Sequence, residues 1–357
     1  MIKLLPWLEP YYQNFIKALD NGRLTPSVII GGSAGQGVYN LALYCAKAYL
    51  CQHRINRHPC GQCRSCTTFE AMSHHDLRVV MPTGPKSKSA DKEGQDFDDF
   101  SNRYEALLSP DIFLKHKKTL RVDALRRMND YVYESSVSGP CKVCLIADAQ
   151  YMNESAANAI LKTFEEPPAN TLLILVSDNY ESLLPTILSR GLKMPLMTTD
   201  TALALQYLEQ NGHDVSLGSV ALSLCDNAPL EAAHLIECGR AEQATALKDA
   251  LCEYVQGRVS ADDIIVMLKE WALDTNLSDL GRILTALIVQ IIKYKAGVGL
   301  ASLPLLDNKT AAVFAQLKAD RLFGAAESLK YLDDMQQGMA IRAPYATLRT
   351  FLAGLLG

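Results

Sequence analysis

The sequence predicts an α/β domain built on a parallel sheet, followed by a second part that is entirely helical. Three observations predict this fold class. A short apolar run at 27–30 leads through a glycine-rich segment into a helical pattern that reaches residue 50. Two longer apolar runs, 143–148 and 171–177, flank one helical segment, as buried parallel strands do. Beyond residue 198 the apolar residues recur only at helical spacing.

The glycine-rich segment 31–37 stands between the first predicted strand and a helix, which is the arrangement of a phosphate-binding P-loop. The lysine that contacts the β- and γ-phosphates is replaced by Val38, and the hydroxyl that holds Mg²⁺ by Tyr39. The backbone N–H groups of the loop could still bind phosphate weakly. Because the lysine and the hydroxyl are both missing, we predict no ATP hydrolysis here. The cofactor-binding residues of this degenerate nucleotide site are Gly32, Gly35 and Gly37.

The second predicted strand ends in Asp148, at the position of the Mg²⁺-binding aspartate of a P-loop NTPase. The next residue, where an active enzyme of this type has a glutamate that orients the attacking water, is Ala149. The lysine, the hydroxyl and the glutamate are therefore absent together, which argues against hydrolysis. An active ATPase with an unusual P-loop is the first alternative, and an ATPase assay on the isolated chain would distinguish it.

Four of the ten cysteines have a C-x8-C-x2-C-x2-C spacing, and they are Cys51, Cys60, Cys63 and Cys66. Four thiolates this close together suit tetrahedral Zn²⁺, and a shell closed by four cysteines predicts a structural site. Two disulfides or a redox pair are the other possibilities, but the absence of an export signal disfavours them. His53 and His58 are close enough in sequence to replace one thiol.

The composition is that of a globular protein of several domains, with 357 residues, 48% hydrophobic residues and a net charge of −4. There is no global basic field, so any nucleic-acid contact must be local. The second alternative, a stand-alone zinc-containing DNA-binding protein, is therefore disfavoured. No apolar window is long enough to span a membrane and no signal-peptide core is present, so we expect a cytoplasmic protein. The polar segment 83–104 predicts a mobile surface loop.

Two motifs resemble bacterial clamp-loader subunits of the AAA+ class. Residues 158–168, NAILKTFEEPP, resemble the family signature ALLKTLEEPP, and residues 184–190, LPTILSR, resemble its LPTIxSRC segment. The cysteine insertion is typical of the same family. The degenerate P-loop and the opening residues 6–8, PWL, are similar to the delta-prime subunits rather than to the ATP-hydrolysing ones.

The resemblance implies a role for Arg190 as an arginine finger, which acts in trans on the ATP of a neighbouring subunit. The other possibility for this arginine is an intramolecular ion pair at a strand end. A guanidinium beside the γ-phosphate stabilises the charge that spreads in the transition state. Gly191 stands where the family has Cys, which we expect to loosen the backbone after the arginine. The arginine expected on the lid near 227–233 is absent, and only the acid Glu231 is present there.

The resemblance also implies the domain organisation and the partners. We expect an AAA+ domain over 1–197 with the zinc module at 51–66, a helical lid over 198–241 and a helical collar over 242–357. The implied function is that of a non-hydrolysing stator subunit of the DNA polymerase III clamp loader, with zinc as a structural cofactor and no productive ATP binding. Its partners would be the gamma/tau ATPase and delta subunits and, through the complex, the sliding clamp and primer–template DNA.

Overall fold

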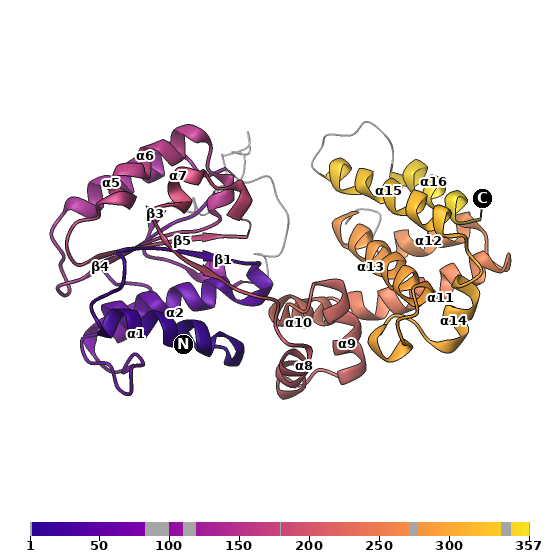
Figure 1. The fold of residues 1–357 in the computed structure, drawn as a ribbon, viewed down its shortest axis with the longest axis horizontal. Coiled ribbons are helices and arrows are strands. Elements are labelled where there is room, and N and C mark those ends of the chain that lie inside the picture. The colour runs from indigo at the N-terminus through magenta and orange to yellow at the C-terminus, as the bar shows by residue number, and fades with distance from the viewer. Residues whose placement is uncertain are drawn as a thin grey trace. The chain divides into compact units, whose positions relative to one another are not determined.

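The computed structural model divides the chain into two compact units, Met1–Thr198 and Thr199–Gly357 (Figure 1). It describes residues 2–82, 100–109, 119–178, 180–271, 277–336 and 344–356. Within these ranges, no helix combines the length and the apolar character that crossing a membrane requires. The further boundary expected at 241/242, between a lid and a collar, stays a prediction.

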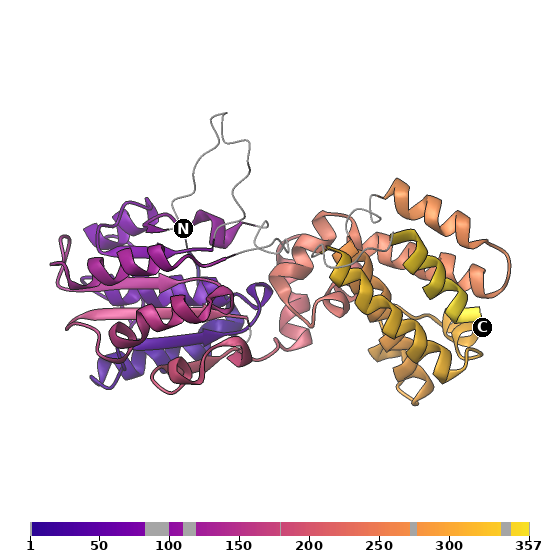
Figure 2. The ribbon, with the colours of Figure 1, turned by 90° about the horizontal axis from the view of Figure 1, so that it is seen from above.

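The first unit is organised around one sheet, whose strands run side by side (Figure 2). In the described part of the chain the sheet has six strands in the order β3-β2-β4-β5-β1-β6. All neighbouring strands are parallel except β2 and β3, which confirms the predicted parallel sheet. The strands are β1 (Ser27–Gly31), β2 (Leu77–Val80), β3 (Phe100–Ser101), β4 (Lys142–Ile146), β5 (Thr171–Ser177) and β6 (Leu192–Pro195).

The register of the strands defines two edges of this sheet. Gly31 at the end of β1 pairs with Ser177 of β5, and we call this side the carboxyl edge. Val28 near the start of β1 pairs with Leu192, the first residue of β6, and we call this side the amino edge. Parallel strands bring residues that follow them to the carboxyl edge and residues that precede them to the amino edge.

Helices cover both faces of the sheet, with α5, α6 and α7 on one face and α1 and α2 on the other (Figure 1). Helix α6 begins as the sequence predicts, because the Asn153 side chain accepts a hydrogen bond from the Ala156 N–H. Its buried Phe164 packs into the core beneath the sheet. The helices of this unit are α1 (Glu9–Asp20), α2 (Val38–Leu50), α3 (Arg64–Glu70), α4 (Glu105–Leu108), α5 (Val122–Tyr133), α6 (Glu154–Glu165) and α7 (Pro185–Leu188).

The described residues of the second unit form helices and connecting turns without any strand, as the periodicity predicts. One continuous apolar cluster extends from Ala204 to Leu355, so the helices share a single core. These helices are α8 (Thr201–Gln210), α9 (Val215–Leu224), α10 (Pro229–Glu237), α11 (Arg240–Val255), α12 (Ala261–Glu270), α13 (Leu277–Lys295), α14 (Asn308–Phe314), α15 (Ala319–Gln336) and α16 (Pro344–Leu356).

The structure describes only the end of the predicted surface loop over 83–104. Residues 83–99 lie outside the described residues. The prediction is wrong at the end of the segment, because Phe100–Ser101 pairs with β2 as the antiparallel strand β3. Phe100 also packs edge-on against the ring of Tyr131, a contact that the polar composition of the segment gave no reason to expect.

Candidate functional site

The glycine loop lies at the carboxyl edge, between β1 and α2, and its end is packed against the N-terminal segment. Gly37 has the left-handed φ of 85°, which favours glycine. A Cβ atom placed there would lie 3.0 Å from Leu5 Cδ1 and 3.2 Å from Leu8 Cδ1. The buried Trp7 donates from its Nε1 to the Gln36 carbonyl at 2.9 Å. The loop is thus covered by side chains of its own chain.

The two residues that replace the catalytic lysine and hydroxyl are both buried at the start of α2. Val38 is 1% exposed and Tyr39 is 3% exposed. The Tyr39 hydroxyl donates a hydrogen bond to Asp148 Oδ1 at 2.5 Å. Burial and the nearby Asp148 charge raise the pKa of Tyr39 well above its ordinary 10.0, so the hydroxyl keeps its proton and acts as the donor.

Asp148 directly follows the buried end of β4 and adopts a left-handed backbone with φ of 49°. One of its carboxylate oxygens accepts from Tyr39 and also from Gln150 Nε2 at 3.3 Å. Ala149 is buried and opens the 3₁₀ turn Ala149–Tyr151, so no carboxylate is present where an attacking water would be oriented. The predicted metal-binding carboxylate is therefore engaged by the side chain that replaced the metal-binding hydroxyl.

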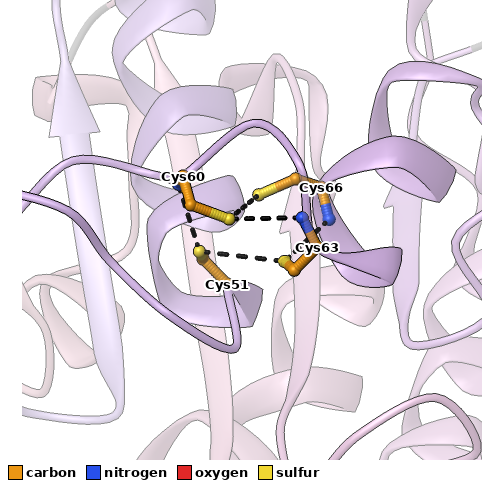
Figure 3. A group of neighbouring side chains, drawn as sticks. All are labelled: Cys51, Cys60, Cys63 and Cys66. Atoms are coloured by element: carbon orange, nitrogen blue, oxygen red, sulfur yellow. Dashed lines mark hydrogen bonds between the residues drawn. The ribbon is translucent and has the colours of Figure 1, made fainter.

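The four cysteines of the spaced motif come together in the segment that runs from the end of α2 into the first turn of α3 (Figure 3). Their sulfur atoms all lie within 4.8 Å of one another, with Cys51 and Cys63 at 4.0 Å and Cys60 and Cys66 at 3.9 Å. Sulfurs bound to one tetrahedral Zn²⁺ lie about 3.8 Å apart for Zn–S bonds of about 2.3 Å. The cluster therefore fits a zinc ion held by four cysteines.

Backbone N–H groups point at these sulfurs, as a thiolate cluster requires. The N–H of Cys63 donates to Cys60 Sγ at 3.3 Å, and that of Cys66 donates to Cys63 Sγ at 3.4 Å. Hydrogen bonds from the N–H groups of Gln62 and Cys63 lower the pKa of the Cys60 thiol to about 6, whereas burial raises the pKa of the Cys51 and Cys66 thiols. All ten cysteines are free, so the alternative of disulfides finds no support.

The nearby histidine His58 has other contacts. It lies 3.0 Å from the Tyr44 hydroxyl through Nδ1 and stacks on the ring of Tyr12. The set of residues suited to a metal contains the four cysteines and no histidine within the described ranges. The possibility that a histidine replaces one thiol is thus not supported.

Arg190 follows α7 and precedes β6, so it lies at the amino edge. Its Nε is 3.0 Å from Glu165 Oε2, and its Nη1 donates to the Thr186 carbonyl at 2.7 Å. The glycine loop lies at the opposite edge, beyond the three strand steps from Val28 to Gly31. Since such steps span about 10 Å, Arg190 is directed away from the nucleotide position of its own chain.

Gly191 is confined by the core. A Cβ atom there would approach Ile29 Cγ1 at 2.7 Å and Phe164 Cε1 at 3.1 Å, distances at which the neighbours must move. Ile29 is fully buried in β1, between β5 and β6. The space available to the Cys of the family motif is here filled by the isoleucine, which accounts for the glycine.

Glu231, the acid found where the lid arginine is expected, has a structural partner. It lies 2.8 Å from Arg282 of α13, and the two side chains are only 15% and 20% exposed. A second pair of similar burial, Arg240 and Asp279 at 2.9 Å, joins α11 to α13. The acid therefore links α10 to the helices that follow it in the chain.

The structure places the predicted site residues at three separate locations. The glycines Gly32, Gly35 and Gly37 share the carboxyl edge with Asp148, the cysteines form a module of their own, and Arg190 stands at the amino edge. Sequence reasoning missed Glu165 as the partner of Arg190. A signal was present in the sequence, because Glu165 lies within the signature segment 158–168, whose prolines mark the end of α6.

Comparisons with known proteins agree with the motifs. A family model described as DNA polymerase III, delta subunit, matches residues 7–200. The chain is similar to the DNA polymerase III subunit delta' of Yersinia pestis, with 27% identity over 300 residues that cover 82% of this chain and 78% of the relative. It is 30% identical over 185 residues to the subunit of the same name from Escherichia coli, covering 52% of this chain and 46% of the relative. A solved gamma subunit-related protein of Thermotoga maritima aligns over 97% of this chain and 98% of its own, with 16% identity and a TM-score of 0.45.

Proposed function

This chain belongs to the DNA polymerase III delta subunit family, whose model matches more than half of it, and on that premise we propose that it is the delta-prime-type stator of a clamp loader. In this role it hydrolyses no ATP itself. It holds a ring of ATPase subunits together and supplies Arg190 to the ATP site of a neighbour. The ring then opens a sliding clamp and loads it onto primed DNA.

The closed glycine loop is the observation that carries the non-hydrolysing role. A Mg²⁺ ion at Asp148 would have to displace the Tyr39 hydroxyl, which is buried and hydrogen-bonded at 2.5 Å. The buried Val38 also stands where the β- and γ-phosphates of ATP would need the positive charge of a lysine. Loss of the charges that stabilise a phosphoryl-transfer transition state removes orders of magnitude in rate. This arrangement argues against the alternative of an unusual but active ATPase.

The position of Arg190 supports a role in trans. The residue lies at the edge of the sheet opposite its own glycine loop, and its side chain is 32% exposed. An arginine that cannot reach the phosphates of its own chain can contribute to catalysis only at the site of another subunit.

The second unit supports the idea of a stator because its helices are fastened to one another. Two ion pairs of low exposure, Glu231 with Arg282 and Arg240 with Asp279, join α10 and α11 to α13. The apolar cluster of this unit runs without interruption through the same helices. A lid that moved with ATP would have to break both pairs, whose charges are partly desolvated.

The cofactor and partners of this proposal follow from the same premise. Zinc held by the four cysteines would fix the module between α2 and α3 and take no part in chemistry, because four thiolates leave no open coordination position. The partners are the gamma/tau ATPase and delta subunits, with the clamp and primer–template DNA reached through the assembled complex. The place of action is the cytoplasm.

The test is to replace Arg190 by Ala in a complex reconstituted with the ATPase subunits. We expect assembly to be intact and DNA-stimulated ATP turnover to fall at least about tenfold, since arginine fingers contribute large factors in rate. Arg126→Ala is the matched control, because this arginine is 70% exposed and pairs only with its helix neighbour Asp123 among the described residues. Turnover equal to that of the control would reject the finger. Mg-dependent ATP hydrolysis by the isolated chain would reject the non-hydrolysing role.

A further inference from the structure

Arg190 is held by contacts to two nitrogens of its guanidinium, Nε and Nη1. Glu165 Oε2 lies 3.0 Å from Nε, and the Thr186 carbonyl accepts from Nη1 at 2.7 Å. Within the described part of the chain, Nη2 makes no hydrogen bond, so this nitrogen on the outer edge of the guanidinium keeps its donors for a ligand. A guanidinium nitrogen left free in this way can donate to a phosphate.

The carboxylate comes from a position that the fold fixes firmly. Glu165 is the last residue of α6, directly after Phe164, which is fully buried. The Phe164 carbonyl accepts a hydrogen bond from the Ser27 hydroxyl at 2.6 Å, which ties the end of α6 to the start of β1. The helix cannot extend through Pro167 and Pro168, so Glu165 stays at the amino edge.

The backbone of the arginine is anchored to the same phenylalanine. Gly191 packs so closely on Phe164 that an added Cβ would lie 3.1 Å from the ring. The Arg190 N–H donates to the Ile187 carbonyl at 3.1 Å, which continues the turn after α7. Both ends of the Glu165–Arg190 pair are therefore set by packing around one buried side chain.

We propose that Glu165 is a positioning residue for Arg190, which holds the Nε side of the guanidinium so that its outer edge faces the γ-phosphate of the neighbouring subunit. This inference rests on the proposed role of Arg190 in trans. A long, flexible side chain loses conformational freedom when it binds, and a contact that restricts it beforehand reduces that loss. The carboxylate lies against Nε and leaves Nη2 uncovered, unlike a two-oxygen pair that would also occupy Nη2.

The experiment uses the reconstituted complex and measures kcat and KM for ATP with Glu165→Ala and Glu165→Gln. Because exposed ion pairs shift equilibria by at most about fivefold, we expect Glu165→Ala to lower kcat about two- to fivefold with KM unchanged. Glu165→Gln keeps the size of the side chain but removes its charge, so it should lower kcat about as much as Glu165→Ala does. Glu166→Ala is the matched control, since it removes an exposed acid from the next position without an ion pair to Arg190 in the described structure.

Glu165→Ala in an Arg190→Ala background shows whether Glu165 affects ATP turnover through the arginine. If Glu165 acts through the arginine, Glu165→Ala causes no further loss of the remaining turnover. An equal loss in both backgrounds, or turnover that is unchanged or raised by Glu165→Ala alone, overturns the proposal. If Arg190→Ala itself has no effect, the finger fails and this proposal fails with it. If Arg190→Ala lowers turnover and Glu165→Ala does not, only the positioning role is lost.

The full chain alone gives the control for folding. The melting temperature should be unchanged in Glu165→Ala, because Glu165 is 52% exposed. A clearly lowered melting temperature would show that Glu165 acts on the fold and would overturn the positioning role.

Discussion

Replacing Tyr39 by Phe removes one oxygen atom from the centre of the closed glycine loop and keeps the ring that fills the space. Asp148 then loses its donor at 2.5 Å, while the bond from Gln150 Nε2 at 3.3 Å remains. The carboxylate belongs to a residue that is 8% exposed, so water replaces the lost hydroxyl poorly. Since a hydrogen bond to a charged group contributes about 1.5–3 kcal/mol, we expect the variant to lose about 2 kcal/mol of stability.

Urea unfolding measures this loss in the unit that contains the loop. The chain has two tryptophans, Trp7 in the first unit and Trp271 in the second, so a Trp271→Phe background lets Trp7 fluorescence report the first unit alone. With a slope of about 2 kcal/mol per molar urea, the midpoint should fall by about 1 M. Tyr49→Phe is the control, because this tyrosine of the same helix makes no hydrogen bond through its hydroxyl within the described residues.

The pH dependence gives a second, independent signature of the same hydrogen bond. Burial raises the pKa of Tyr39 above its ordinary 10.0, so the folded protein holds this proton at a pH where the unfolded chain releases it. The stabilisation by Tyr39 is therefore fully present below pH 10 and is lost as pH rises above it. The stability gap between wild type and Tyr39→Phe should narrow above pH 10. A midpoint equal to that of the wild type at neutral pH would refute the hydrogen bond to Asp148.

Three further predictions concern the core, the zinc module and the loop. Gly191→Cys should cost about 1–3 kcal/mol in urea unfolding through overpacking, and less in an Ile29→Ala background, which removes Cγ1 and Cδ1; an equal cost in both would contradict the packing. Purified, reduced protein should contain one zinc ion per chain by metal analysis, and chelation should lower its thermal stability; metal-free protein of native stability would contradict the module. Val38→Lys should create no ATP hydrolysis, because the hydroxyl and the glutamate are still missing, and it should destabilise the fold, because it buries a charge beside Tyr39. Mg-dependent ATP turnover by this variant would show that the missing hydroxyl and glutamate do not prevent hydrolysis.

The elements that sequence reasoning predicts well are those specified by local signals. Asn153 caps α6, and the prolines after Glu166 prevent its extension, so both ends of the helix can be placed from neighbouring residues. The cysteine spacing likewise predicts a cluster whose members lie close together in the chain. In contrast, Tyr39 and Asp148 are 109 residues apart, and no local pattern indicates that one donates to the other. The P-loop motif places both residues at one metal site, at the carboxyl edge where β1 and β4 end, but it does not predict that the tyrosine occupies the carboxylate.

Gly191 shows why a departure from a motif has to be judged against the core beneath it. Taken alone, a glycine after Arg190 suggests a looser backbone and a weaker finger. The structure instead fills the position of the missing side chain with Ile29, so the glycine is confined between β1 and Phe164. Positions 29 and 191 share one volume, and a larger residue at either requires a smaller one at the other. The motif keeps its arginine, and Ile29 of β1 occupies the space beside Gly191.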